Sequence, residues 1–366
     1  MKLVCSKAEL SRVVTLAQSA VSNKSTLPVL NNLLFEADKD GLTVTGTDLE
    51  MGLRCRAKVE VVQAGSCTLP AKKLAEIIRT LDDGDVELTV KDGTKAELKA
   101  GKATFRLVGV PAEDYPNFPG YRKEKNLTLP AKTLLTMIKK TGFSVSTDET
   151  RYILQGGLLQ AGNKKVKMVT TDGHRLSYME QDLPTQDEAV QAVVPSKALN
   201  ELSKVLDNSD ESVTIYFTDN QLFIEKGELT LFSRLIDGQF PNYEQVIPKK
   251  NEHTLIAETS TLSKVVSRMA LLATDKGNSV KFHLKDDQLN ITASTPDQGE
   301  SEESLDVDYQ GPPMTVAFNA KYLLEVLRAL DSERVEIKLS TPLSPSLVTA
   351  VGGDNGSRYV VMPMRA

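Results

Sequence analysis

The sequence has few of the residues and segments that are typical of membrane, secreted and metal-binding proteins. Its 366 residues include no Trp and only three His and three Cys. No stretch approaches the ~20 apolar residues that a membrane-spanning helix needs. The start, Met1–Lys7, has no apolar segment of the kind found in secretory signals. The sequence therefore predicts a cytoplasmic protein with no membrane-embedded part.

The cysteines do not indicate a disulfide framework or a metal site. Cys5, Cys55 and Cys67 are odd in number, and no two of them are separated by only two residues. Such a set is typical of reduced thiols in a cytosolic protein. We expect no metal and no cofactor.

Catalytic motifs are also missing. The chain has no phosphate-binding P-loop, dinucleotide-binding glycine motif, zinc-protease helix or nucleophile elbow. The most suggestive cluster, Asp172-Gly173-His174-Arg175, could in principle serve phosphate hydrolysis, but adjacency in sequence does not establish acid–base geometry. His253 and His283 stand alone, and an isolated His is more often structural than a ligand. The sequence predicts a protein that is not an enzyme.

Composition alone does not favour a nucleic-acid partner. Lys and Arg number 44 against 49 Asp and Glu, so the formal net charge is −5. With 9 Tyr and 10 Phe, the chain also offers few side chains on which single-stranded bases could stack. Hydrophobic residues at 40% and charged residues at 25% are typical of a folded globular protein, and the length suggests two or three domains.

A short pattern recurs six times along the chain. Each copy predicts a short strand followed, after a capping residue or a proline, by an amphipathic helix. In the copy that begins at Thr68, apolar residues follow at Leu74, Ile77, Ile78 and Leu81, the spacing of one helix face. The corresponding leucines, 60 to 65 residues apart, are Leu10, Leu74, Leu134, Leu199, Leu262 and Leu323.

A longer period lies over the short one. Thr47-Asp48, Thr171-Asp172 and Thr295-Pro296 follow one another at intervals of 124 residues. One third of 366 is 122 residues, so we expect three equivalent domains, each with two strand–helix half-units. Strands grouped after single helices favour an α+β fold with antiparallel sheets. Asp40-Gly41, Asp92-Gly93 and Asp237-Gly238 are predicted to be turns between strands. The predicted domains are 1–120, 125–248 and 253–366.

Basic residues recur in phase with the leucines. A Lys lies two residues before the leucine in four copies, and a basic residue follows five after it, which returns to nearly the same helix face. On one helix this pattern is an ordinary solvated surface. Its recurrence on most of the helices favours a surface that binds phosphates without reading bases, over a scaffold that binds only proteins. The basic residues of this stripe are Lys72, Arg79, Lys132, Lys139, Lys197, Lys204, Lys321 and Arg328.

Simple geometry suggests how such a surface could close. Six helices side by side, at about 10 Å each, enclose a hole only about 20 Å wide. Twelve helices from two chains enclose about 40 Å, which accommodates duplex DNA with water around it. A ring would also leave no open sheet edge. These considerations indicate a closed or curved scaffold with a basic inner face, and they leave open whether DNA lies inside it.

Several segments carry a resemblance to a known family. They are Leu27-Pro28-Val29-Leu30-Asn31-Asn32-Leu33, Thr45-Gly46-Thr47-Asp48-Leu49-Glu50, Thr170-Thr171-Asp172-Gly173-His174-Arg175-Leu176, Phe240-Pro241-Asn242-Tyr243 and Tyr359-Val360-Val361-Met362-Pro363-Met364-Arg365. In this order, and over the whole chain, the sequence resembles the bacterial β sliding clamps, the processivity subunits of the DNA polymerase III holoenzyme. The resemblance implies a head-to-tail homodimeric ring that encircles duplex DNA during replication, slides without sequence specificity and has no catalytic activity. It also implies partners that bind through short peptides, namely the polymerase III catalytic subunit, the clamp loader, and other polymerases and repair proteins.

The resemblance places a peptide-binding pocket between the second and third domains. Leu, Val and Met side chains would form adaptable apolar subsites there, and a few polar groups would orient the peptide. Two positions depart from the family pattern: Gln245, where an Arg is common, and Gly277, where a large aromatic can gate the pocket. The implied pocket residues are Leu154, Thr171, Gly173, His174, Arg175, Leu176, Pro241, Val246, Asn319, Tyr322, Leu343, Val360, Met362, Pro363, Met364 and Arg365.

The resemblance also implies residues that contact DNA and residues that join two chains. Asp148 departs from the uncharged amide common at its position and is left out, because a carboxylate repels phosphates. For the dimer, Phe105 and Leu107 would meet Leu271 and Leu272. Around them, Lys73 and Lys102 would pair with the acidic run Asp297, Glu300, Glu302 and Glu303. The implied DNA contacts are Lys24, Lys72, Arg79, Tyr152, Lys197 and Lys204.

Overall fold

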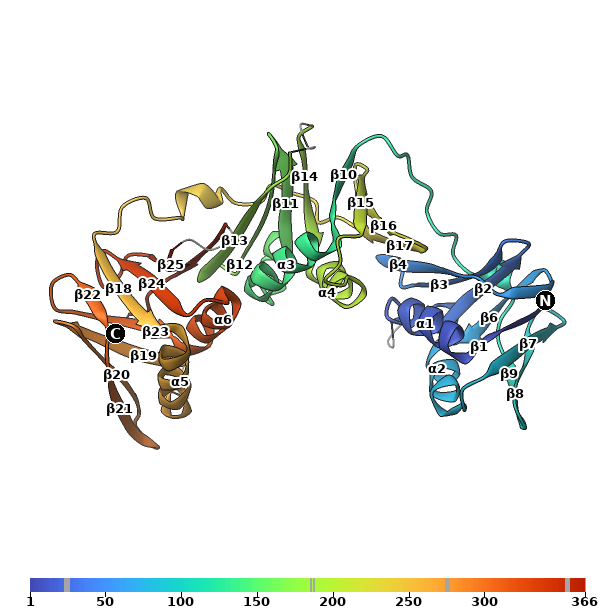
Figure 1. Cartoon of the computed structure of the whole chain (residues 1–366), viewed down its shortest axis with the longest axis horizontal. Coiled ribbons are helices and arrows are strands. Elements are labelled where there is room, and N and C mark those ends of the chain that lie inside the picture. The colour runs from blue at the N-terminus through green and yellow to red at the C-terminus, as the bar shows by residue number, and fades with distance from the viewer. Residues whose placement is uncertain (23–26, 185, 187, 274–276, 353–355, 366) are drawn as a thin grey trace. The chain divides into compact units, whose positions relative to one another are not determined.

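The computed structural model describes residues 1–22, 27–184, 186, 188–273, 277–352 and 356–365. The chain forms two compact units, one of residues 1–132 and 204–235 and the other of residues 133–203 and 236–366. The middle range expected from the repeats, 125–248, thus contributes to both units. Figure 1 labels helices and strands of both units.

The first unit contains two antiparallel sheets and two helices. Helices α1 (Lys7–Gln18) and α2 (Ala71–Thr80) pack against each other, and both sheets contribute to the core beneath them. The first sheet has the order β5 (Glu60–Gln63), β1 (Lys2–Ser6), β7 (Asp85–Lys91), β8 (Lys95–Ala100) and β9 (Ala103–Val108). The second has the order β10 (Asn126–Pro130), β15 (Ser212–Phe217), β16 (Gln221–Lys226), β17 (Leu229–Arg234), β4 (Met51–Ala57), β3 (Gly41–Thr47), β2 (Asn32–Asp38) and β6 (Gly65–Pro70).

The second unit repeats this plan. Helices α5 (Thr259–Met269) and α6 (Ala320–Leu330) pack against each other over a core that includes Phe282 and Tyr359. The larger sheet has the order β14 (Val190–Pro195), β11 (Gly156–Gly162), β12 (Lys165–Thr171), β13 (Arg175–Asp182), β26 (Ser357–Val361), β25 (Ser346–Ala350), β24 (Arg334–Leu339), β18 (His253–Glu258) and β22 (Asp308–Gln310). The smaller has the order β21 (Gly299–Asp306), β20 (Gln288–Thr295), β19 (Ser279–Lys285) and β23 (Met314–Asn319).

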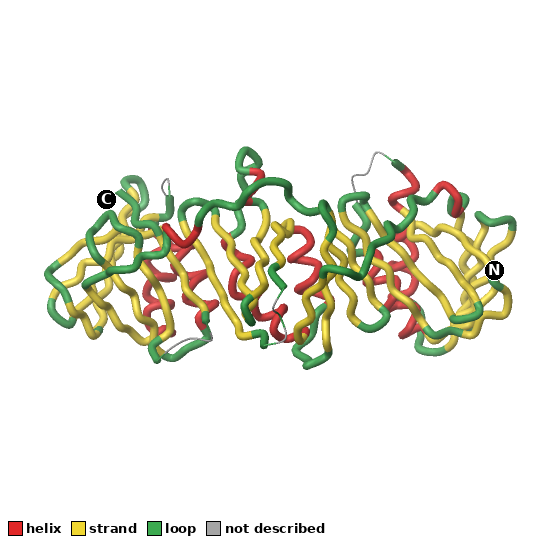
Figure 2. Tube along the Cα trace, turned by 90° about the horizontal axis from the view of Figure 1, so that it is seen from above, coloured by secondary structure: helices red, strands yellow, loops and turns green. Residues whose placement is uncertain are grey.

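The remaining elements are two helices and several short 3₁₀ turns. The helices are α3 (Ala131–Thr141) and α4 (Ser196–Val205). The turns are η1 (Pro28–Asn31), η2 (Ala112–Asp114), η3 (Gly142–Ser144), η4 (Tyr152–Leu154), η5 (Tyr243–Gln245) and η6 (Ala270–Leu272). Figure 2 shows that strands dominate both units. No helix in the described part of the chain is long and apolar enough to cross a membrane.

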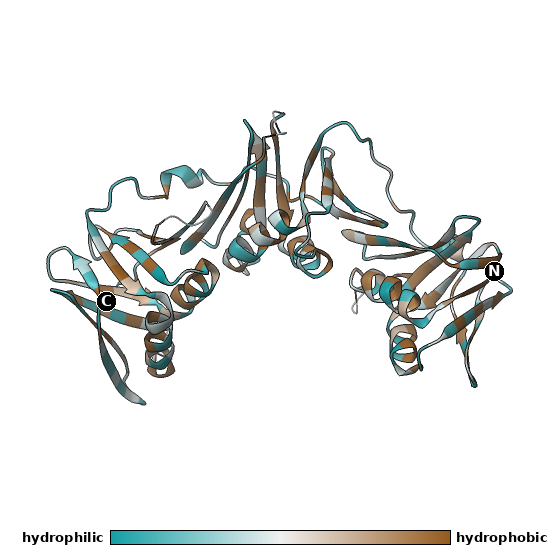
Figure 3. Ribbon diagram, in the orientation of Figure 1, coloured by the Kyte–Doolittle hydropathy of each residue, from teal (hydrophilic) through white to brown (hydrophobic). Residues whose placement is uncertain are grey.

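The predicted strand–helix repeat is confirmed. The six copies form β1–α1, β6–α2, β10–α3, β14–α4, β18–α5 and β23–α6. In α2, Leu74 and Ile78 are buried while Lys72 and Arg79 are exposed, so one face packs and the other meets solvent. Figure 3 shows this division of polar and apolar residues on the helices. The α+β fold with antiparallel pairing is therefore as expected.

The 124-residue period is a repeat of turn geometry. The turns β3–β4 and β12–β13 each begin with a Thr-Asp pair, whose Thr hydroxyl donates to the fourth residue on: Thr47 to the Met51 carbonyl at 2.8 Å and Thr171 to the Arg175 carbonyl at 2.6 Å. The second residue after each Thr has a positive φ, 77° at Leu49 and 86° at Gly173. A side chain such as Leu is strained in that conformation, whereas Gly is not.

Two smaller expectations have different outcomes. Asp40-Gly41 and Asp92-Gly93 join paired strands as predicted, but Asp237-Gly238 lies between β17 and η5 and joins no strand pair. Cys5, Cys55 and Cys67 are buried and free of disulfides. Burial raises the pKa of Cys5 and of Cys67 to about 12, so these thiols remain protonated at neutral pH.

Candidate functional site

The turn between β12 and β13 is built by the carboxylate of Asp172. Its Oδ1 accepts the backbone N–H groups of His174 at 2.9 Å and of Arg175 at 3.0 Å. This is an Asx-type turn, in which a short acidic side chain replaces backbone partners. The cluster Asp172-Gly173-His174-Arg175 therefore has a structural role, because the Asp172 carboxylate is hydrogen-bonded to backbone N–H groups and to the Arg175 side chain.

Arg175 links three parts of the second unit. Its side chain is only 6% exposed, and its Nε donates to Asp172 Oδ2 at 3.0 Å. One terminal nitrogen is paired with Glu325 of α6, and the other donates to the Phe143 carbonyl of η3 at 2.6 Å. The guanidinium also lies 4.4 Å from the ring centre of Tyr322. Such a fully bonded buried Arg holds β13, η3 and α6 together.

The C-terminal segment extends this linkage. After β26, Met362 donates its N–H to the His174 carbonyl at 2.9 Å, and Met364 donates to the Ala317 carbonyl at 2.7 Å. The segment, which carries two methionines and a proline, therefore connects the β12–β13 turn to β23. The His174 ring is stacked on Tyr322, with centres 6.4 Å apart.

Gly277 borders the same segment. Its φ is 120°, and a Cβ atom at this position would overlap the methyl group of Met364. The absence of a side chain at 277 is therefore what lets Met364 occupy this place. The second departure, Gln245, ends η5 and is exposed.

An apolar floor lies beneath the β13–β26 pair. Leu154, Leu176 and Val360 are buried in one cluster, together with Phe240 and Tyr243. Leu176 and Val360 face each other across the strand pair. The floor is therefore assembled from segments more than 200 residues apart in sequence.

The other predicted pocket residues belong to the same unit, and most of them are partly or fully exposed. Asn319 caps α6, where its side-chain oxygen accepts the Tyr322 N–H at 3.1 Å. Val246 and Leu343 are exposed apolar side chains, at 42% and 64%. The half-exposed members are Thr171, Asn319, Tyr322, Met362, Pro363 and Met364, and the remaining exposed ones are Gly173, His174, Pro241 and Arg365.

Several contributors to this surface were missed from sequence. Glu325 and Phe143 hold Arg175 from segments with no local motif, so nothing in the sequence marked them. Phe240 and Tyr243 were visible in the Phe-Pro-Asn-Tyr segment, although only Pro241 was assigned to the pocket. Leu347 packs against the floor because β25 pairs with β26, which a linear pattern does not reveal.

The predicted DNA contacts are exposed where the structure describes them. Lys72 and Arg79 lie on α2, Lys197 and Lys204 lie on α4, and Tyr152 in η4 is 59% exposed. Lys24 lies outside the described residues.

Part of the basic stripe is paired within the chain. Lys132 lies 2.6 Å from Asp210, and outside the stripe Lys7, at the start of α1, lies 3.1 Å from Asp83. Asp148, which was left out of the DNA contacts, lies 3.5 Å from Arg151, and hydrogen bonds from Thr150 lower its pKa. Asp148 is therefore a carboxylate at neutral pH.

The predicted dimer residues lie on two edge strands and beside them. β9, with the half-exposed Phe105 and Leu107, ends the first sheet of the first unit, and β21 ends the smaller sheet of the second. Leu271 is 73% exposed, and its neighbour Leu272 is half-exposed.

Two charged members of this set, Lys73 and Glu303, already have partners in their own chain. Lys73 lies 2.7 Å from Glu76, and Glu303 of β21 is paired with Arg268. Arg268 holds the pKa of Glu303 below its ordinary value. Pairing between two chains would therefore compete with these contacts, whereas Lys102 and Glu300 are exposed and form no ion pair within the described residues.

The fold and this surface define a protein of three α+β repeats with antiparallel sheets. Three family models match it in order: the N-terminal, central and C-terminal domains of the DNA polymerase III beta subunit, at residues 1–119, 128–242 and 244–365. The chain belongs to the DNA polymerase III beta subunit family. It is 37% identical over 368 residues to the beta sliding clamp of Proteus mirabilis and 34% identical over 367 residues to that of Escherichia coli K12, with all of each chain covered.

Solved structures agree with this assignment. A DnaN sliding clamp from Pseudomonas aeruginosa bound to griselimycin superposes with a TM-score of 0.96 at 34% identity, with all of both chains covered. The DNA polymerase sliding clamp of Bacillus subtilis gives a TM-score of 0.96 at 28% identity, covering 100% of this chain and 99% of the other.

Proposed function

We propose that this protein is a DNA sliding clamp, a processivity factor that tethers DNA polymerase III to duplex DNA without catalysing a reaction. The observation that carries the proposal is the match over the full length of both chains to beta sliding clamps. The site of action is the cytoplasm, where replication takes place in a bacterium.

Two copies would form the ring, head to tail, with each chain divided into domains at 1–120, 125–248 and 253–366. The edge strands β9 and β21 support this arrangement, because an edge strand presents unpaired backbone groups to a partner. Phe105 and Leu107 on β9, and Leu271 and Leu272 after α5, supply apolar surface that a dimer would cover. Lys73, Lys102, Glu300 and Glu303 would surround that contact.

Duplex DNA would pass through this ring and contact its basic side chains. Lys72, Arg79, Lys197 and Lys204 are exposed on two helices, which suits contact with phosphates rather than bases. Lys24 and Tyr152 would add further contacts. Phosphate contacts carry no sequence information, so the ring would slide.

Polymerase III, the clamp loader, and other polymerases and repair proteins would bind through short peptides at the surface around Arg175. Its buried apolar floor, its methionines and its polar rim suit a peptide that inserts a few apolar side chains. One solved relative is bound to griselimycin, which supports a ligand-binding role in the family.

The test is retention on DNA of different topology. The protein, loaded by a clamp loader on nicked circular DNA, should stay bound through gel filtration and should be lost when a restriction enzyme linearises the circle. Equal retention on circular and linear DNA would contradict the ring. The solution mass should correspond to two chains, and a stable monomer at working concentration would also contradict it.

A further inference from the structure

The outer sheet face of the first unit repeats the construction of the surface around Arg175. Strands β2, β3 and β4 recur 124 residues later as β11, β12 and β13. The segment after β9 recurs 125 residues later, so that Pro116 corresponds to Pro241 and Phe118 to Tyr243. β17 lies beside β4 as β26 lies beside β13. The first unit therefore holds a counterpart of the proposed peptide surface.

The apolar half of this counterpart is filled by the chain itself. Gly52 on β4 corresponds to Leu176 on β13. The residue paired with Gly52 on the neighbouring strand is Phe232, and the residue paired with Leu176 is Val360. A Cβ atom on Gly52 would overlap the Phe232 ring. Phe118 packs edge-on against Phe232, with ring centres 5.0 Å apart and planes at 89°. Apolar side chains of a peptide therefore have no room here.

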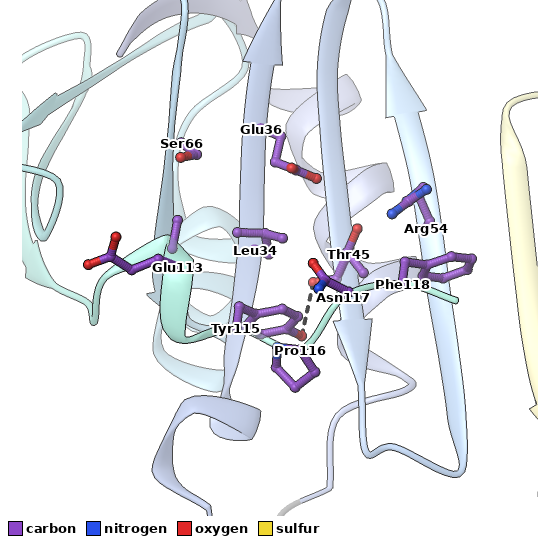
Figure 4. Close-up of a pocket in the computed structure, with 11 residues that line it drawn as sticks. Leu34, Glu36, Thr45, Arg54, Ser66, Glu113, Tyr115, Pro116, Asn117 and Phe118 are labelled. Atoms are coloured by element: carbon purple, nitrogen blue, oxygen red, sulfur yellow. Dashed lines mark hydrogen bonds between the residues drawn. The ribbon is translucent and has the colours of Figure 1, made fainter. Parts of the chain in front are cut away.

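The polar half is open. A cavity of about 310 Å³ lies between the sheet and the segment that crosses it, and Figure 4 shows the residues around it. Its lining includes Leu34, Glu36, Thr45, Arg54, Ser66 and Tyr115. This volume suits a side chain or a small polar group.

The lining differs in chemistry from its counterpart. Thr45 corresponds to Val169 and Arg54 to Tyr178, two members of the apolar floor in the second unit. The repeat has therefore placed a hydroxyl and a guanidinium where the other surface has apolar atoms.

Two buried polar atoms in this lining lack a hydrogen-bond partner among the described residues. They are Thr45 Oγ1, in a residue only 1% exposed, and Arg54 Nε. The Thr45 carbonyl, by contrast, accepts the Tyr115 hydroxyl at 3.3 Å (Figure 4). Buried polar atoms are nearly always satisfied by a protein group, a water or a ligand, so both atoms are available to bond to a group that enters the cavity.

The Arg54 guanidinium is arranged to bind a carboxylate. Its central carbon lies 4.1 Å from the Phe118 ring centre, and no acidic side chain of the described residues lies within 4.0 Å of it. Burial lowers the pKa of Arg54, which reflects a charge deprived of water. A stacked guanidinium keeps its planar edge available for two parallel hydrogen bonds to a carboxylate. Arg56, two residues on, is instead paired with Asp38 at 3.0 Å.

We propose that this cavity is a second binding site, which accepts the carboxylate side chain of an acidic residue in a partner peptide. Arg54 pairs with the carboxylate, and the Thr45 hydroxyl donates to it. Glu36 and Glu113 flank the cavity and disfavour a second negative charge, so a single carboxylate fits better than a phosphate. The inference that the cavity binds a carboxylate rests on the first unit alone. The inference that this carboxylate belongs to a partner peptide rests on the function proposed above for the surface around Arg175.

The test is a titration of the full-length protein, followed by ¹⁵N-resolved NMR, with two capped pentapeptides of alanine that carry a central Glu or a central Gln. The Glu peptide should bind at millimolar concentration or below, and the Gln peptide about tenfold more weakly, since one charge-assisted pair is lost. Arg54→Gln should weaken the Glu peptide about tenfold, and Glu36→Gln should strengthen it several-fold by removing a like charge.

Two further variants separate binding from folding. Thr45→Val introduces the residue found at the corresponding position of the second repeat, so it should fold and weaken the Glu peptide several-fold. Arg122→Gln removes the same charge from a side chain that is 88% exposed and should change nothing.

Equal binding of the Glu and Gln peptides, or no effect of Arg54→Gln and Thr45→Val, would overturn the proposal. If acetate binds as tightly as the Glu peptide, the cavity is a site for free carboxylates, and the proposal that it binds a partner peptide is wrong. Arg54→Gln should leave retention on circular DNA unchanged, so failure here and failure of the clamp function are distinguishable.

Discussion

At the scale of single residues, Arg175 has the largest number of partners at the candidate site. It touches Asp172, Glu325, Phe143 and Tyr322, which belong to three segments of the second unit, the β12–β13 turn, η3 and α6. Its charge is compensated on both sides, so its loss would leave two carboxylates facing a space without a cation.

Arg175→Ala should lower the free energy of unfolding by about 3 kcal/mol, because removing one partner of a buried ion pair strands the others. Urea unfolding followed by circular dichroism measures this. The matched control Arg122→Ala, at an exposed position, should change it by less than about 0.5 kcal/mol. Equal midpoints for the two variants would show that the network around Arg175 contributes nothing.

Gly277 is a second position where one residue controls the surface. Gly277→Ala should displace Met364, because the new Cβ overlaps its methyl group and the positive φ is strained for Ala. We expect binding of a polymerase-derived peptide to weaken by about 1 kcal/mol, several-fold in Kd, as measured by fluorescence anisotropy. Gly120→Ala, where no atom lies within 4 Å of the new Cβ, is the control and should bind normally. Normal peptide binding by Gly277→Ala would show that the position of Met364 does not matter for the pocket.

At the scale of elements, the segment after β26 is attached mainly through its backbone. Met362 donates to the β12–β13 turn and Met364 donates to β23, so the backbone of this segment bonds to parts of two sheets.

Deletion of residues 362–366 should abolish peptide binding and leave the dimer intact, since the proposed dimer contacts lie on β9, β21 and the end of α5. Anisotropy titration and analytical ultracentrifugation measure the two properties. Unchanged peptide affinity in the truncated protein would refute the assignment of this segment to the pocket.

The basic helices give a second prediction at this scale. Replacing Lys24 and Lys72 by Glu should weaken DNA binding and reduce the slope of log affinity against log salt by roughly 2, because about one counterion is released per phosphate contact. Lys39→Glu, an exposed Lys in the β2–β3 turn, serves as the charge control. An unaltered slope in the double variant would mean that these lysines face away from DNA.

At the scale of the whole molecule, association should depend on small apolar contacts at two sheet edges. Leu271 is 73% exposed in the single chain, so Leu271→Asp should leave each chain folded.

In a dimer, however, that carboxylate would be buried against Phe105 and Leu107, at a cost of several kcal/mol. We therefore expect Leu271→Asp to sediment as a monomer. Val62→Asp, which places the same charge on an exposed position of β5, should remain dimeric. A dimeric Leu271→Asp would place the interface elsewhere.

The sequence supplied much of the fold for a definite reason. Each strand–helix copy is local, so its apolar spacing and its capping residue act within about twenty residues, and the six copies appeared as expected. The Thr-Asp pairs, which the sequence showed only as a 124-residue period, form turns because the Thr and Asp side chains bond to backbone groups two to four residues away. Asp237-Gly238 misled because the same dipeptide also occurs in segments that join no strands.

The sequence by itself determined the repeats, the α+β content and the membership of the family, since these depend on periodicity and on order along the chain. Only the tertiary structure decided which side chains meet. The contacts of Arg175 with Phe143 and Glu325, the fit of Met364 over Gly277 and the cavity beside Arg54 join segments up to 150 residues apart. Contacts over such separations are set by sheet pairing and packing, which no local pattern encodes.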